Sequence, residues 1–186
     1  MNKRSILTIF ILFVLIASNV FSQEALKKGS YSLSGSISFS SGTNSARSNE
    51  TDYLNFLITP GLTYFFIDYL SAGINLSYGY YENTWKSGTQ EFKNIYRSVS
   101  IGPVIRYYFS SETFIPFLET SYRYSNSLSG NQDMNSYSLA GGINYFLSKS
   151  VALEPYAAYV KTNYIEDDQK ISSISVGLRI NYFIVD

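Results

Sequence analysis

A strict alternation of apolar and hydroxyl side chains over residues 29–41 constrains the fold more than any other feature of the sequence. From Tyr31 to Phe39 the odd positions are apolar or glycine, and the even positions from Ser30 to Ser40 are all serine. Successive side chains of a strand point to opposite faces, so this pattern predicts a strand with one apolar and one hydroxyl face. Small serines suit a narrow hydrated interior, and the apolar face then faces lipid.

Seven further segments repeat this alternation, so we expect eight strands. The additional segments are residues 52–66, 70–81, 92–109, 114–125, 136–146, 151–161 and 172–186. No stretch after Gln23 is apolar for the length that a membrane-spanning helix needs, and a chain that crosses a bilayer without helices must close into a barrel. The predicted fold class is all-β: a closed eight-stranded antiparallel transmembrane β-barrel with an up-and-down meander.

The predicted connections alternate in length. Residues 67–69, 110–113 and 147–150 are short, whereas residues 41–51, 82–91, 126–135 and 163–171 are longer and rich in Ser, Asn, Gly and charge. Short periplasmic turns and longer surface loops are typical of outer-membrane barrels, so we expect both termini on the periplasmic side.

Residues 1–22 have the pattern of a secretory signal peptide. Lys3 and Arg4 precede an apolar run over residues 6–17, and Val20-Phe21-Ser22 offers a small-residue cleavage site. A retained amphipathic or membrane anchor is the alternative interpretation. We therefore expect export to the outer membrane of a Gram-negative cell, with residues 23–186 as a single barrel domain.

The charges in the middle of the predicted strands all have the inward parity. A Lys or Arg at mid-bilayer on the lipid face costs about 2–4 kcal/mol, which explains a face cleared of charge. These five inward charges form the candidate lumen site: Arg106, Glu119, Arg123, Glu154 and Arg179.

Four of these charges, Arg106, Glu119, Glu154 and Arg179, are expected at a similar depth near the periplasmic rim. We expect Arg106 diagonally near Glu119 and Glu154 diagonally near Arg179, and Glu154 with Arg106 across the lumen is the alternative pairing. The neutral layer could act as a gate or only as a packing plug. Arg123 could pair with Glu119 or reach water.

The prolines are unusual for a closed barrel, because proline removes a donor from the hydrogen-bond ladder. All of them have lipid-facing parity inside predicted strands, where we expect local bulges and uncertain register. They are Pro60, Pro103, Pro116 and Pro155.

Several short motifs resemble the small outer-membrane β-barrel domain family of Bacteroidota, whose members are similar to OmpX and OmpA. They are Ile101-Gly102-Pro103-Val104-Ile105-Arg106-Tyr107-Tyr108-Phe109, Phe114-Ile115-Pro116-Phe117-Leu118-Glu119, Asn144-Tyr145-Phe146-Leu147-Ser148 and Ser150-Val151-Ala152-Leu153-Glu154. The stretch from Val176 to Phe183 resembles a terminal strand that the barrel-assembly machinery recognises, although Ile184-Val185-Asp186 extend beyond it. The resemblance implies an eight-stranded barrel and supplies no catalytic residues, and its salt-bridge layer resembles the gate of OmpA-like barrels.

The composition argues against enzymatic, metal and nucleic-acid functions. The chain has no His and no Cys, which removes the usual general base and the most frequent metal ligands. Without Lys3 and Arg4 it has 12 basic and 14 acidic residues, which gives no basic footprint for nucleic acid. We expect no catalysis, no cofactor and no metal. Glu166-Asp167-Asp168 is interpreted as a solvated turn, and calcium binding there with Asp133 is the alternative.

Two classes of function remain open at this point. The first is a structural or surface-interaction protein, because eight strands leave an interior just filled by side chains. The second is a narrow transport or small-ligand-binding barrel, since a lumen of serine and glycine leaves room for water. A soluble lipocalin-like barrel is a third reading. The expected partners are outer-membrane lipid and lipopolysaccharide, the barrel-assembly machinery during insertion and an unidentified partner of the surface loops, and we expect a monomer.

Overall fold

The computed structural model describes residues 24–46, 49–87, 90–109, 114–130, 133–166 and 169–185. The predicted signal peptide, the predicted turn at residues 110–113 and the pair Asp167-Asp168 lie outside the described residues. A short 3-10 helix, η1 (Glu24–Leu26), precedes eight strands. The strands are β1 (Tyr31–Ala46), β2 (Asn49–Ile67), β3 (Leu70–Ser87), β4 (Gln90–Tyr108), β5 (Phe114–Ser127), β6 (Met134–Phe146), β7 (Val151–Tyr164) and β8 (Lys170–Ile184).

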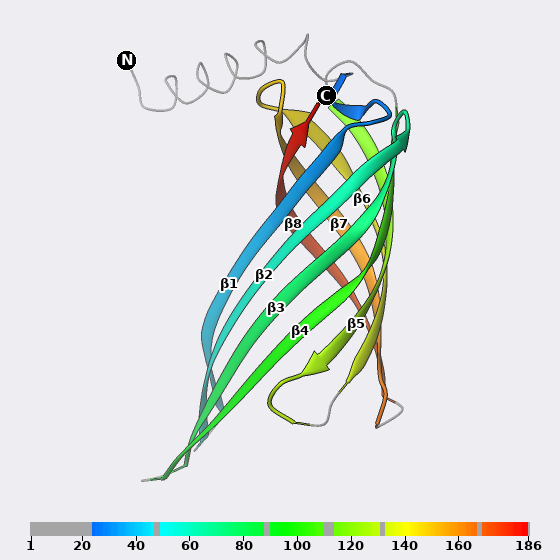
Figure 1. Cartoon of the computed structure of the whole chain (residues 1–186). Helices are drawn as coiled ribbons and strands as arrows, with labels where there is room; N and C mark the ends of the chain where they lie inside the picture. The colour runs from blue at the N-terminus through cyan, green and yellow to red at the C-terminus, as the bar shows by residue number, and fades with distance from the viewer. Residues whose placement is uncertain are drawn as a thin grey trace, which may run out of the picture.

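The eight strands form a closed antiparallel barrel in which each strand pairs with its neighbours in the sequence (Figure 1). The predicted fold class and strand number are therefore confirmed. β1 begins and β8 ends at the same end of the barrel, which we call the terminal end; the opposite end is the far end. Within the described residues, no helix has the length and apolar character to cross a membrane.

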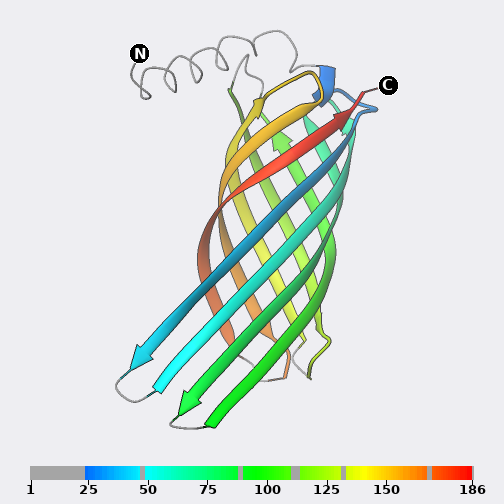
Figure 2. The same cartoon turned by 90° about the vertical axis from the view of Figure 1, so that its left-hand side faces the viewer.

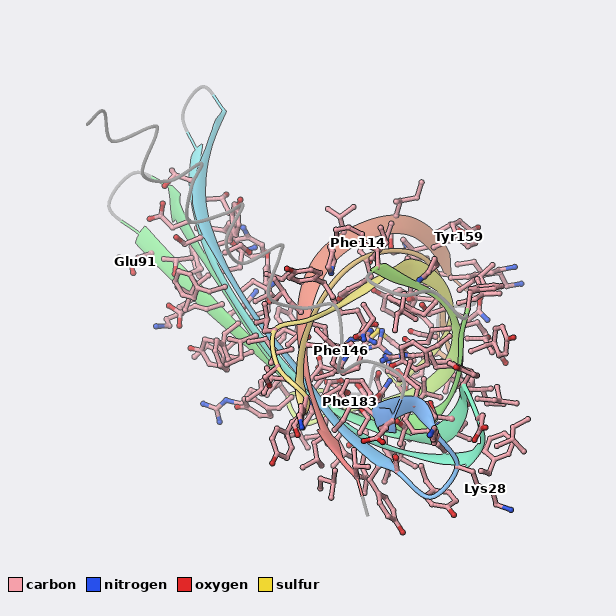
Figure 3. The ribbon with its side chains drawn as sticks, turned by 90° about the horizontal axis from the view of Figure 1, so that it is seen from above. Lys28, Glu91, Phe114, Phe146, Tyr159 and Phe183 are labelled. Atoms are coloured by element: carbon pink, nitrogen blue, oxygen red, sulfur yellow. The ribbon has the colours of Figure 1, made fainter. Side chains whose placement is uncertain are left out.

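The period-2 pattern sets which side chains enter the barrel. In the last five residues of β4, the side chains of Val104, Arg106 and Tyr108 are buried. Those of Ile105 and Tyr107 are exposed. In the view along the barrel, Phe146 and Phe183 lie inside the ring of strands, whereas Tyr159 lies at its outside (Figure 3). The outward and inward parities of the sequence pattern are thus those of the folded barrel.

The first four strands are longer than the sequence pattern predicts. Residues 41–51 and 82–91, expected as surface loops, are mostly strand: the β1–β2 ladder continues to Ala46↔Asn49 and the β3–β4 ladder to Ser87↔Gln90. These two hairpins run past the ends of β5–β8 and lean away from the barrel axis (Figures 2 and 3). We call this far-end extension of β1–β4 the blade. The loop prediction was wrong here because hydrated strands and loops share the same polar composition.

The barrel closes between β1 and β8 over a short ladder. It comprises five residue pairs, from Tyr31↔Ile184 to Gly35↔Ile180. Within the described residues, the far-end remainder of β1 pairs with β2 alone and that of β8 pairs with β7 alone. We call the gap between these two unpaired edges the seam.

Three of the four prolines interrupt a ladder and none shifts its register, so the prediction of bulges at these positions was wrong. Around Pro60 the β2–β3 register passes from Ile58↔Tyr78 to Gly61↔Asn75, and no residue is inserted. Two pairs are likewise missing at Pro103 and at Pro155, and pairing resumes in the same register. Pro116 stays paired within the β5–β6 ladder, and its carbonyl oxygen accepts a hydrogen bond from Phe109 N at 2.8 Å. All four rings face outward, and each proline removes one N–H donor from the barrel wall.

Gly102 permits a close approach of β4 and β5 beside Pro103. A Cβ atom added at Gly102 would lie 1.9 Å from the carbonyl oxygen of Tyr122 and 2.8 Å from the Cα of Arg123. We expect Gly102→Ala to lower the free energy of unfolding by about 1–3 kcal/mol, because the backbone of β5 must move. Gly35→Ala is the matched control, since a Cβ there has nothing within 4 Å, and it should change stability by less than about 0.5 kcal/mol. Urea titration in lipid vesicles measures both, and equal losses would contradict the close approach.

The two faces of β6 should respond differently to an introduced charge. Leu139 lies in the middle of the strand and is exposed on the outer face, whereas the adjacent Ser138 lines the lumen. Leu139→Arg should cost about 2–4 kcal/mol of folding free energy in a bilayer. Ser138→Arg should cost less than half of that, because its guanidinium enters a polar cavity. Similar losses in vesicle-based urea titrations would show that the outer face of β6 does not contact lipid.

Candidate functional site

Four of the five predicted lumen charges form one layer inside the barrel. Arg106 on β4 lies directly opposite Glu119 on β5, and Glu154 on β7 lies directly opposite Arg179 on β8. The expected diagonal placement is therefore corrected to direct opposition. All four side chains occupy inward positions at the same depth in the barrel, where they contact one another.

Each arginine of this four-charge layer contacts both carboxylates. Arg106 Nε donates to Glu119 Oε2 at 2.8 Å, and its Nη1 donates to Glu154 Oε2 at 3.1 Å. Across the lumen, Arg179 Nη1 donates to Glu119 Oε2 at 2.8 Å and lies 3.5 Å from Glu154 Oε1. Asn181 Nδ2 also donates to Glu154 Oε2. The layer thus combines the neighbouring-strand and the cross-lumen pairings that the sequence left as alternatives.

The four-charge layer is almost completely removed from solvent. The exposed fractions of the side chains are 3% for Arg106, 5% for Glu119, 0% for Glu154 and 12% for Arg179. The guanidinium of Arg106 lies 5.1 Å from the ring centre of Phe117, and that of Arg179 lies 4.8 Å from the ring centre of Tyr156. Desolvation of four ions is costly, so the layer requires that each charge keep its partners.

Aromatic side chains fill the lumen between the four-charge layer and the terminal end of the barrel. The tilted rings of Phe146 and Phe183 lie 5.1 Å apart between their centres, and those of Phe65 and Tyr108 lie 5.7 Å apart. Ala25 and Leu26 of η1 are buried against these rings, and Leu26 O accepts a hydrogen bond from Tyr69 N at 2.7 Å. We call this assembly the terminal plug; its members are Ala25, Leu26, Phe65, Tyr108, Ile115, Phe117, Phe146, Ala152 and Phe183.

The sequence reasoning missed the terminal plug. Its signal was present, because Phe65, Tyr108, Phe146 and Phe183 occupy inward positions close to the terminal-end limit of their strands. Parity distinguishes these residues from membrane-interface aromatic residues, which take outward positions.

A cavity of about 370 Å³ lies on the far-end side of the four-charge layer. Arg123 projects into it from β5, and Glu119 and Arg179 form part of its floor. Serine side chains supply much of the remaining wall, among them Ser121, Ser138 and Ser175. None of the ion pairs between described residues involves Arg123, so the predicted option of pairing with Glu119 is not realised. Arg123 instead presents its charge to the cavity.

The candidate acidic clusters do not converge. Within the described part of the chain, no group of three or more His, Cys, Asp or Glu side chains has a metal-binding arrangement. Asp133 accepts hydrogen bonds from Tyr124 and from Asn126 Nδ2, the latter at 3.0 Å, and so braces the β5–β6 connection. Glu166 is exposed, and its two acidic neighbours lie outside the described residues.

The fold is similar to three solved outer-membrane proteins. The outer membrane protein OprG from Pseudomonas aeruginosa matches with a TM-score of 0.53 at 13% identity, covering 88% of this chain and 99% of OprG. The N-terminal β-barrel domain of Pseudomonas aeruginosa OprF gives 0.52 at 15% identity, covering 84% and 98%. Neisserial surface protein A gives 0.50 at 16% identity, covering 83% and 97%. None of the protein-family models matches the chain, and no curated protein matches it.

These comparisons define the class of the fold. The chain has the architecture of the small eight-stranded outer-membrane β-barrels, and the match extends over almost the whole length of each related structure. At identities of 13–16% the likeness concerns the fold alone.

The four-charge layer should behave as a coupled unit. Glu119→Ala leaves two buried arginines with one carboxylate and should cost about 3–5 kcal/mol of unfolding free energy. The double variant Glu119→Ala/Arg179→Ala keeps the neutral pair of Arg106 and Glu154, so it should be more stable than Glu119→Ala alone. A double-mutant cycle by urea titration in vesicles measures this coupling.

An exposed ion pair in the blade provides the control for this cycle. Lys93 Nζ lies 2.7 Å from Glu82 Oε1, and the Lys93 side chain is half exposed. Lys93→Ala should therefore destabilise the barrel far less than Glu119→Ala does, because solvent screens this pair. Additive losses for the Glu119 and Arg179 substitutions would show that the lumen charges act independently.

Proposed function

We propose that this protein is an integral outer-membrane barrel without catalytic activity, closed at its periplasmic end, that presents the blade as an interaction surface outside the cell. The observation that carries the proposal is the terminal plug together with the four-charge layer. Because these two layers fill the lumen at the terminal end, partners can contact only the barrel wall and the far end. Export by the signal peptide and membership of a Bacteroidota-type barrel family are part of the same proposal.

Exposed aromatic side chains on the blade support a role in recognition. Tyr81 pairs with Tyr96 and Trp85 pairs with Phe92 across β3 and β4, and all four rings are exposed. Their parity is that of the lumen face, continued past the point where the opposite wall of the barrel ends. Aromatic side chains contribute strongly to protein interfaces, and these rings do not belong to the lipid face. Figure 3 shows how far Glu91, at the end of this hairpin, lies from the barrel mouth.

Small-ligand binding is a second candidate function. The cavity beside Arg123 favours it, because it combines free volume, hydroxyl groups and a positive charge. Passage of ions straight through the lumen receives no support from the geometry, since the four-charge layer and the terminal plug occupy its terminal end.

The proposed location and orientation can be tested by cysteine labelling, because the chain contains no cysteine. Trp85→Cys on the blade should react with a membrane-impermeant maleimide on intact cells. Ser148→Cys, exposed at the terminal end, is the matched control and should react only after the outer membrane is permeabilised. Equal labelling of both positions on intact cells, or recovery of the protein in the soluble periplasmic fraction, would refute the proposal.

The closed end predicts an absence of ion conduction. The purified protein in planar bilayers should show no sustained open-channel current at moderate voltage. Phe183→Ala removes a fully buried ring from the terminal plug, and it should increase the frequency of openings relative to Leu147→Ala, an exposed control outside the plug. Steady conductance by the unmodified protein would show that the plug does not seal the lumen.

A further inference from the structure

The lumen cavity and the outer face of the barrel share lining residues at the seam. A second, apolar groove of about 460 Å³ lies there, bounded by β1, β2 and β8. Ser36, Ile37 and Leu178 line both the lumen cavity and this groove. The two spaces therefore adjoin each other where the β1–β8 ladder has ended.

The seam exposes apolar side chains that a continued ladder would cover. Ile37 on β1 is 69% exposed, and Ile174 and Val176 on β8 are 80% and 82% exposed. Unpaired strand edges are costly in hydrocarbon, and they are tolerated where they line a hydrated cavity. The serine-rich lumen provides such a cavity on one side of the seam, while its other side is apolar.

The charges that line the lumen cavity do not balance. The four-charge layer is neutral as a unit, with two arginines and two glutamates in mutual contact. Arg123 adds a positive charge that none of the ion pairs between described residues compensates, and Arg179 faces the same cavity. A negatively charged group entering the cavity would thus find one uncompensated guanidinium and several hydroxyl donors.

We propose that the seam is a binding site for an anionic single-chain amphiphile. Its head group lies in the lumen cavity against Arg123, and its hydrocarbon chain passes between β1 and β8 into the groove lined by Ile37, Ile58 and Ile180. A fatty acid and a monoacyl phospholipid share this chemistry. The inference rests on the proposed membrane location only for the source of the ligand, since the cavity, the charge and the seam belong to the folded barrel itself.

Binding can be measured on the purified full-length barrel in phosphatidylcholine nanodiscs. The probe is a fatty acid with a conjugated tetraene chain, whose fluorescence rises when the chain is immobilised, and the alcohol of the same chain is the uncharged comparison. The acid should bind at least tenfold more tightly than the alcohol, because a hydrogen bond to a charged group is worth that factor or more. Empty nanodiscs give the signal from lipid partitioning alone.

Substitutions at Arg123 test the charge. Arg123→Gln should weaken binding of the acid by about tenfold and leave binding of the alcohol unchanged, and Arg123→Lys should restore most of the affinity. Arg97→Gln is the matched control, because Arg97 is exposed on β4 where β5 ends, and it does not line the cavity. Equal binding of acid and alcohol by the unmodified protein, or an equal effect of Arg97→Gln, would overturn the proposal.

Photolabelling tests the path of the chain. A fatty acid with a diazirine near its terminal methyl group should label residues of β1 and β8 at the seam, and labelling spread evenly over all outward faces would refute the site. Displacement of the probe by dodecanoate identifies a free fatty acid, displacement by lysophosphatidylglycerol identifies a membrane lipid, and displacement by neither contradicts the proposal. These measurements do not depend on cellular location, so the cysteine labelling and the binding assay can fail separately.

Discussion

The mutual compensation of four buried charges is the interaction on which the interior of this barrel depends. An eight-stranded barrel has a lumen just wide enough for side chains, so an ion placed inside it has little access to water. Arg106 and Arg179 each contact both Glu119 and Glu154, and this distributes the compensation over four strands. The layer therefore joins β4 and β5 to β7 and β8 through the middle of the barrel, in addition to the ladders in its wall.

The four-charge layer also divides the lumen into two regions of different chemistry. On the terminal-end side, Phe65, Phe146 and Phe183 pack with η1 into a dry plug. On the far-end side, hydroxyl groups and Arg123 line an open cavity. From the far end to the terminal end, the lumen thus contains a polar cavity, the four-charge layer and the apolar plug. This order places each kind of side chain in a favourable environment.

The wall of the barrel is as uneven as its interior. The β3–β4 ladder runs along the full length of both strands, whereas the β1–β8 ladder ends after five residue pairs. The blade and the seam both follow from this difference in ladder length. β1–β4 continue in a direction that β5–β8 do not follow (Figure 1). The surface proposed for recognition and the site proposed for an amphiphile both arise where strands lack a partner on one side.

The sequence by itself determined the strand count, the meander and the face on which each side chain lies, because these follow from a period of two and from the cost of charge in lipid. It also placed Arg106, Glu119, Glu154 and Arg179 at one depth. The tertiary structure alone decided the direct opposition of the charge pairs, since register depends on turn geometry that composition does not encode. It likewise decided that residues 41–51 extend strands, that Phe65 and Phe183 meet in a plug, and that β1 and β8 separate beyond Gly35. The plug and the separation of β1 from β8 concern segments that are distant in the chain. The local alternation of side chains carries no information about which distant edge a strand will reach.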